Sequence, residues 1–306
     1  MGLALSSVHL LAKSLESVGE LATKKILTLG VQDCDFTYVE IVQLLAKHRM
    51  RHFPLPASEI QLTAGFKWVA PETRSQYRDK IHQDTLFRIL GFTKENIYSL
   101  DADNFEGATF VHDLNSPCAP HLRSRFDVIF DGGTSEHVFS VKDNLFGLAD
   151  MCSPGGIIIN LLPVDYINHG FYNFNAELLR DFFGCNGFQQ LDLRYIASPQ
   201  NPRLAQKYYL AFDPAHFNHS LNPFLLTLLY SVARKTSQVV PVVPNQGFYR
   251  VLWKQDGRGP DPLPQPASRL SGRWKRELIN WMDSFFFTSV LIRGYALLRK
   301  GERVVL

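Results

Sequence analysis

The chain has 306 residues, of which 45% are hydrophobic, 12% aromatic and 20% charged, and its formal net charge is +3. This composition excludes a disordered chain and fits one large α/β domain or two smaller ones. The small net charge argues against nucleic acid as the main partner.

Four scattered cysteines, at positions 34, 118, 152 and 185, show no Cys/His spacing typical of a zinc site. We therefore expect no metal site and a reduced, cytoplasmic compartment. No basic cluster precedes an apolar run at the N-terminus, so a cleaved signal peptide is not expected. The uncharged run 284–292 is far shorter than the ~20 residues of a spanning helix, which predicts a soluble or at most peripheral protein.

The first hundred residues predict a helix, a strand and an insertion. Val8, Leu11, Leu15 and Val18 have helical spacing, and the helix should end near residues 19–23. A β-prone run at 25–30 then predicts the first strand, which a glycine ends. Residues from about 34 to 96 contain helical patterns at 38–47 and 74–90. We interpret this segment as a helical insertion beside the ligand site.

Strands and helices alternate from residue 97 onward. Strands are predicted at 97–101, 108–113, 126–131 and 156–160, with a helix at 141–151 between the last two. Such a βαβ pattern with continuously apolar strands predicts an α/β fold with a doubly wound, mostly parallel sheet. Further on, 177–183 predicts a helix and 189–195 a strand, whereas 226–234 fits either.

The predicted domain spans residues 1–253. A proline-rich linker at 254–268 and a helical arm at 269–306 follow it. The arm has tryptophans, phenylalanines and basic residues, so it is expected to pack on the domain, bind a protein or lie on a membrane surface.

Glycines and acidic residues follow the predicted strands. Gly30 ends the first strand, Asp101 and Asp113 end the next two, and residues 131–137 follow the fourth. The carboxyl ends of parallel strands open onto one crevice, which is where ligands bind in open α/β sheets. We therefore expect these residues to share a rim.

Four runs between residues 97 and 188 carry a resemblance to a known family, in the same order along the chain: LDADNFEGATFVHDLN, FDVIFDGGTSEHVF, CSPGGIII and HGFYNF. A weaker match lies at ILTLG. With them the chain resembles the class I S-adenosylmethionine-dependent methyltransferases, most of all bacterial stand-alone domains linked with glycan or small-metabolite modification. The resemblance implies a Rossmann-like methyltransferase fold and S-adenosylmethionine as the cofactor.

The resemblance also implies roles in cofactor binding. Gly30 matches the glycine that lets the backbone approach the ligand. Asp101 matches the carboxylate that accepts hydrogen bonds from both ribose hydroxyls. Asp113 matches the residue beside the adenine amine, and Leu114 would pack on the ring. Alternatively, Asp101 and Asp113 are ordinary turn residues at strand ends.

The methionine end of the ligand would be lined by Asp131, Gly132 and Gly133. The first loop departs from the family pattern, because Thr28 replaces the usual acid, while Gln32 and Cys34 stand where glycines are common. Gln32 is then a candidate to bind the amino or carboxylate group of the ligand.

Three residues are candidates for removing a proton from an acceptor hydroxyl: Glu136, His137 and His169. Tyr172 is close to the last of these in the sequence. The alternative is that Glu136 and His137 cap the next helix or hold the loop, and that His169 makes a structural hydrogen bond or one that orients the acceptor.

The leading interpretation is an enzyme that methylates oxygen in a small-molecule or glycan acceptor. A non-catalytic scaffold with a degenerate cofactor loop is the alternative. Nucleic-acid amino methylation is disfavoured because no Asp/Asn-Pro-Pro-Tyr motif follows the fourth strand, and a nicotinamide enzyme is disfavoured because no Gly-x-Gly-x-x-Gly follows the first.

Overall fold

A computed structural model describes residues 3–63, 77–199, 206–211, 225–247 and 303–305. Its helices are α1 (Leu5–Leu15), α2 (Tyr38–Lys47), α3 (Gln83–Leu90), α4 (Val141–Met151) and α5 (Ala176–Cys185). Its strands are β1 (Ile26–Leu29), β2 (Asp33–Thr37), β3 (Lys80–His82), β4 (Ile97–Asp101), β5 (Phe110–Val111), β6 (Phe126–Asp131), β7 (Cys152–Pro163), β8 (Phe188–Pro199), β9 (Gln206–Ala211), β10 (Leu225–Lys235) and β11 (Arg303–Val305).

One large sheet runs through the molecule in the order β11-β9-β8-β10-β7-β6-β1-β4-β5. The five strands from β7 to β5 are parallel to one another. β10 runs antiparallel to both of its neighbours, β7 and β8. From β1 the chain builds outward through β4 and β5 on one side, then returns to build β6 and β7 on the other. The order therefore reverses between β1 and β6.

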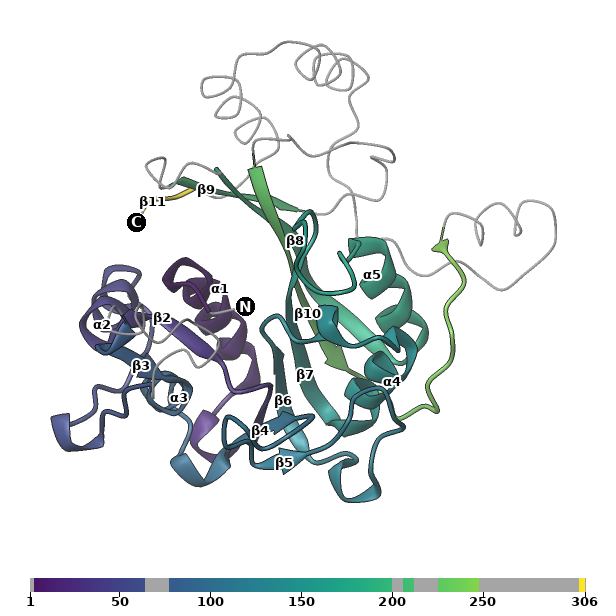
Figure 1. The fold of residues 1–306 in the computed structure, drawn as a ribbon, viewed down its shortest axis with the longest axis horizontal. Coiled ribbons are helices and arrows are strands. Elements are labelled where there is room, and N and C mark those ends of the chain that lie inside the picture. The colour runs from purple at the N-terminus through teal and green to yellow at the C-terminus, as the bar shows by residue number, and fades with distance from the viewer. Residues whose placement is uncertain (1–2, 64–76, 200–205, 212–224, 248–302, 306) are drawn as a thin grey trace, which may run out of the picture.

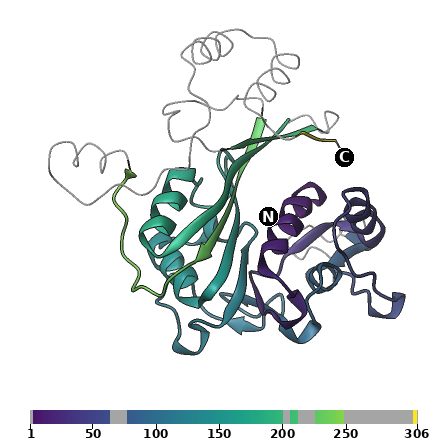
Figure 2. The ribbon, with the colours of Figure 1, turned by 180° about the vertical axis from the view of Figure 1, so that it is seen from behind.

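Helices cover both faces of this sheet. Figure 1 shows α1, α2 and α3 on one side and α4 and α5 on the other, and the reverse view in Figure 2 agrees. Two buried clusters follow from the alternation of side chains along the strands. Ile26 and Phe130 pack into the cluster under the first three helices. Leu27 and Ile129, one residue away, pack into the cluster under the last two. The predicted doubly wound sheet is confirmed.

Local signals set the ends of two predicted helices. Thr37 and Glu40 form a capping box at the start of α2, in which each side chain accepts from the backbone N–H of the other. The side chain of Ser140 accepts from the backbone of Asp143 at the start of α4. Both helices have the predicted bounds, 38–47 and 141–151.

The segment after β1 contains more than helices. The pattern at 74–90 predicted a single helix, but among the described residues α3 begins only at Gln83, and Lys80–His82 form β3. This strand pairs antiparallel with β2 to make a separate two-stranded sheet. A short strand of this kind is fixed by its distant partner, so local periodicity could not reveal it.

The remaining differences lie at the ends of helices and strands and in the C-terminal part. α1 ends at Leu15, before the predicted end near residues 19–23. β5 is shorter than predicted, β7 begins at Cys152 instead of Gly156, and the ambiguous segment 226–234 is part of β10. The linker 254–268 lies outside the described residues. Of the arm at 269–306 only Arg303–Val305 is described, and it forms β11 at the edge of the sheet beside β9. None of the described helices combines the length and hydrophobicity needed to cross a membrane.

Candidate functional site

The candidate site lies where the strand order reverses. Parallel pairing puts Leu29 beside Leu100 on β4 and beside Asp131 on β6, and Asp131 beside Asn160 on β7. The loops that follow β1, β4, β6 and β7 therefore leave the sheet at one edge. In an open α/β sheet this switch point is the place where neighbouring loops diverge and a ligand can enter.

Gly30 and Asp101 are neighbours at this edge. The backbone N–H of Gly30 donates to the carbonyl of Leu100 at 2.7 Å. A Cβ on Gly30 would lie 3.9 Å from Oδ2 of Asp101 and 3.2 Å from Oγ1 of Thr134, and its φ of +69° favours glycine. The structure thus brings together two of the predicted cofactor residues.

The carboxylate of Asp101, the last residue of β4, is half-buried. Its Oδ1 accepts the N–H of Ala102 at 2.6 Å. Burial raises the pKa of Asp101 above its ordinary value. The backbone N–H of Asp103 also donates to this carboxylate. Because each carboxylate oxygen has two acceptor positions, the group can still accept further hydrogen bonds.

Gln32 is buried between the loops after β1 and β6. Its backbone N–H donates to Oε1 of Gln83 at 2.7 Å, and its side-chain amide donates to the carbonyl of Leu29. Its Oε1 accepts no hydrogen bond from the described residues and abuts Gly132, where a Cβ would clash with it. The side chain of Gln32 therefore packs between two loops, and its amide oxygen is buried without a hydrogen-bond partner among the described residues.

Asp113 behaves as the turn residue that the sequence allowed. It is exposed, and its Oδ1 accepts from both the backbone and the side chain of Asn115, which hold its pKa below the ordinary value. Leu114 is buried in the core under α4 and α5. Asn115 in turn accepts from the backbone of Ser140, so this turn is tied to the loop after β6.

Asp131 is fully buried and its carboxylate is turned inward. Oδ1 accepts from the backbone N–H groups of Thr134 and Ser135, at 3.1 and 3.3 Å. Oδ2 accepts from the hydroxyl of Ser135 at 2.6 Å and from the amide of Asn160 at 3.1 Å. The side chain was expected to line the methionine end of a ligand, but four donors use it to fix the loop. Gly133, in that loop, has a φ of +99°.

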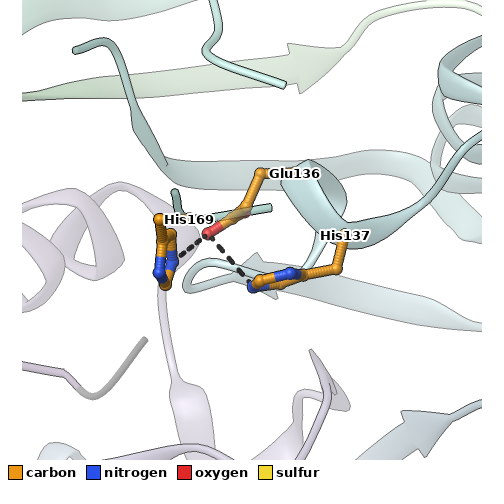
Figure 3. Close-up of side chains that lie close together, drawn as sticks. All are labelled: Glu136, His137 and His169. Atoms are coloured by element: carbon orange, nitrogen blue, oxygen red, sulfur yellow. Dashed lines mark ion pairs between the residues drawn. The ribbon is translucent and has the colours of Figure 1, made fainter. Parts of the chain in front are cut away.

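This loop presents Glu136 and His137 from a short 3-10 helix, Ser135–His137, and it meets His169 from the loop after β7. Oε1 of Glu136 lies 3.4 Å from Nε2 of His169 and 3.9 Å from Nε2 of His137. The two imidazole rings are 5.0 Å apart between centroids. Figure 3 shows the carboxylate between the two rings. The three predicted catalytic residues therefore converge.

Burial shapes the electrostatics of these three groups. Glu136 is fully buried, and its pKa is raised to about 7, mainly by burial and to a smaller extent by the negative charge of Asp131. Burial also lowers the pKa of His137 and of His169, with the neighbouring imidazole adding to the effect at His137. Both histidines remain partly exposed, at 47% and 31% of their side chains. Solvent thus reaches the cluster from the histidine side.

Backbone contacts fix the two loops against each other. The N–H of Phe171 donates to the carbonyl of Glu136 at 2.7 Å. Gly170, with a φ of +75°, packs so closely that a Cβ would lie 2.7 Å from the same carbonyl. The hydroxyl of Tyr172 donates to the carbonyl of Phe139 at 2.8 Å. Tyr172 therefore clamps the loop, and the position of His169 is coupled to that of Glu136.

Sequence reasoning missed the residues that support the site. Thr134 donates from its hydroxyl to the carbonyl of Leu29 at 2.7 Å and so joins the first loop to the fourth. Asn144 of α4 donates to the hydroxyl of Ser135 at 2.6 Å, which extends the Asp131 network into the helix. The available signal was the position of two asparagines, Asn160 at the end of an apolar strand and Asn144 in a predicted helix. Both are buried in the structure, and asparagine is seldom buried without a specific partner.

The strand order decides the fold class: five parallel strands reverse order at β1, and a single antiparallel strand, β10, separates β7 from β8. The chain has a Rossmann-like methyltransferase fold. The fold that the resemblance implied is thereby confirmed.

No protein-family model matches the sequence, and a search of curated proteins gave no match. Among solved structures, a putative methyltransferase from Bacillus halodurans C-125 is 10% identical with a TM-score of 0.39, over 74% of this chain and 99% of its own. The YcgJ protein from Bacillus subtilis is 11% identical with a TM-score of 0.37, over 76% and 99%. The 1,6-didemethyltoxoflavin-N1-methyltransferase from Burkholderia thailandensis, with bound S-adenosylhomocysteine, is 11% identical with a TM-score of 0.35, over 73% and 76%. Similarity this low carries no conclusion about activity, which depends on the site itself.

Proposed function

We propose that the chain transfers a methyl group from S-adenosylmethionine to an oxygen atom of a small-molecule or glycan acceptor. The observation that carries this proposal is the adjacency of Gly30 and Asp101 at the switch point, next to the loop that presents Glu136. A carboxylate beside a glycine at a strand end suits a ribose, since it accepts from two hydroxyls while the bare backbone permits close approach. This part of the site holds the cofactor.

The transfer requires the acceptor oxygen, the methyl carbon and the sulfur to lie nearly in line, with water kept out. The oxygen forms a bond to the methyl carbon while the carbon–sulfur bond breaks, and the electron pair stays on sulfur. The acceptor hydroxyl gives up its proton, and Glu136, His137 and His169, on the loops after β6 and β7, are polar side chains that can assist this loss. We therefore place the acceptor hydroxyl beside these three side chains.

One observation favours the alternative of a non-catalytic scaffold. The buried side chain of Gln32 fills space against Gly132, where a smaller residue in the first loop would leave room for a ligand. If this side chain excludes the cofactor, the fold serves as a support for other contacts. The two possibilities differ in whether S-adenosylmethionine binds at all.

Calorimetric titration with S-adenosylmethionine separates them. Saturable binding is expected, and Asp101→Asn should weaken it by about 10-fold to 100-fold, because hydrogen bonds to a charged acceptor contribute about 1.5–3 kcal/mol. Asp103→Asn is the matched control, since Asp103 is an exposed carboxylate two residues away whose Oδ1 accepts from the backbone of Phe105. Equal affinities for both variants, or no binding at millimolar ligand, would remove the proposed cofactor site.

A further inference from the structure

We propose that Glu136, His137 and His169 bind a first-row divalent metal ion, and that this ion receives the acceptor hydroxyl. The metal site stands on the geometry of the three side chains, whereas its part in methyl transfer rests on the proposed function. The widely spaced cysteines and histidines of the sequence gave no indication of such a site, because its ligands come from two distant loops.

The three side chains offer a donor set that metal ions use. Each supplies one ligand atom, and these atoms all lie within 4.8 Å of one another. Two imidazoles and one carboxylate leave open coordination positions, an arrangement known from iron and zinc sites. Ligand bonds of about 2.1 Å put adjacent ligand atoms roughly 3.0–3.5 Å apart. The 3.4 Å between Glu136 and His169 fits this spacing, and the 3.9 Å to His137 needs only a small turn of an exposed ring.

The carboxylate of Glu136 lacks a hydrogen-bond donor from any other described residue. It is fully buried, yet neither of its oxygens accepts a hydrogen bond from another described residue. Nε2 of His169 is also buried and lacks a hydrogen-bond partner among them. A buried carboxylate without a hydrogen-bond donor from another residue is costly, whereas Asp131 in the same loop has four donors. A cation between Glu136 and the two imidazoles would satisfy these atoms together.

The loops hold the ligands in place before any ion arrives. The backbone bond from Phe171 to Glu136 joins the loop of His169 to the loop of the other two ligands. At the neck of the His169 loop, Asn173 accepts from the N–H of Tyr166 and donates to its carbonyl. A site fixed in this way loses little conformational entropy on binding a metal ion.

The open side of the cluster suits an acceptor that pairs a hydroxyl with an apolar face. Phe139 and Phe171 are 70% and 66% exposed, and they form an edge-to-face pair with centroids 5.8 Å apart. Both come from the loops that carry the cluster. A ring-shaped acceptor can pack on these phenyl groups while its hydroxyl reaches the ion.

The ion's part in the reaction is to make the hydroxyl acidic. An acceptor hydroxyl bound to the cation loses its proton to water, as metal-bound water does near neutral pH. The resulting oxyanion attacks the methyl carbon, the carbon–sulfur bond breaks, and neutral S-adenosylhomocysteine leaves. The proton has then gone to solvent, and the three side chains act as ligands instead of bases.

Cobalt titration of the full chain, freed of affinity tags and treated with a chelator, tests the site. Co²⁺ should bind in a one-to-one ratio and produce visible absorption bands that report its ligands. Glu136→Gln and His169→Asn should each weaken Co²⁺ binding by about 100-fold or more, since losing even an outer partner of a metal ligand costs 10-fold to 100-fold. His121→Ala, which removes an exposed histidine outside the cluster, should bind like the wild type.

Circular dichroism of each variant establishes that it folds, and His137→Asn adds a variant at a side chain that is partly exposed. The proposal is overturned if Co²⁺ does not bind at millimolar concentration, or if it binds the wild type and the cluster variants equally. Titration with S-adenosylmethionine in the presence of chelator is read separately. Cobalt binding without S-adenosylmethionine binding would support the metal site and contradict the methyltransferase function. S-adenosylmethionine binding without cobalt binding would support the cofactor site and contradict the metal site.

Discussion

Oε1 of Glu136 lies 3.4 Å from Nε2 of His169, although one residue follows β6 and the other follows β7. The parallel pairing of these two strands places their loops side by side, and the backbone bond from Phe171 to Glu136 fixes the distance between them. The three candidate groups therefore form one unit. A change in either loop should affect all of them.

The buried carboxylate of Glu136 should destabilise the folded state of the metal-free protein. With a chelator present, Glu136→Gln is expected to raise the free energy of unfolding by about 1–3 kcal/mol, because the amide removes a buried carboxylate that has no hydrogen-bond partner. Urea unfolding measures this. Glu95→Gln, at an exposed position, should stay within about 0.5 kcal/mol of the wild type. A destabilised Glu136→Gln would show that the carboxylate supports the apo fold.

Gly170 should be intolerant of any side chain. Gly170→Ala places a Cβ at 2.7 Å from the carbonyl of Glu136 and also adopts a φ of +75°, so the two loops must separate. We expect a loss of more than about 2 kcal/mol in unfolding free energy and weaker Co²⁺ binding. Gly155→Ala is the control, because its φ of +79° is similar but the space around it is open. It should lose only about 1–2 kcal/mol. Equal losses in both variants would mean that the loop contact is unimportant.

Asp131 should matter mainly for stability. Asp131→Asn removes the negative charge that accepts four hydrogen bonds, and it places an amide N–H₂ group opposite hydrogen-bond donors. We expect the free energy of unfolding to fall by about 3 kcal/mol. On the same strand, Asp127 is partly exposed and pairs with Lys24. Asp127→Asn should lose no more than about 1 kcal/mol. Urea unfolding of both variants checks this, and similar losses would contradict the structural role of Asp131.

Cofactor affinity should fall as the pH falls. Burial raises the pKa of Asp101, so its carboxylate takes up a proton at a higher pH than an ordinary aspartate does. Only the ionised form accepts from both ribose hydroxyls, so the dissociation constant of S-adenosylmethionine should rise as the pH falls towards the raised pKa of Asp101. Asp101→Asn should lack this component of the pH dependence. Parallel calorimetric pH profiles for the two proteins would count against a role of Asp101.

Much of the fold could be predicted because its signals are local. The capping box of Thr37 and Glu40 and the cap at Ser140 set helix starts that the sequence displays directly. Continuous apolar runs revealed β6, which has the predicted bounds, and most of β7. The strand at Lys80–His82 was missed because only its pairing with β2 makes it a strand.

The sequence indicated where the candidate site lies, but not which way its side chains point. Strand ends indicated Gly30, Asp101 and the loop after β6, since parallel strands open at one edge. Sequence alone did not indicate that Asp131 faces inward to four donors whereas Glu136 faces two histidines without a hydrogen bond. Side-chain direction in a loop depends on contacts with distant segments, which here include Asn160 and Gly170.

Hydrogen–deuterium exchange with and without S-adenosylhomocysteine reports where an adenosyl ligand binds, and so tests the proposed cofactor site. We expect slower exchange in the segments after β1, β4 and β6, around Gly30, Asp101 and Glu136, and unchanged exchange in α5. Unchanged exchange at the three strand ends with saturating ligand, or protection confined to another part of the chain, would contradict it.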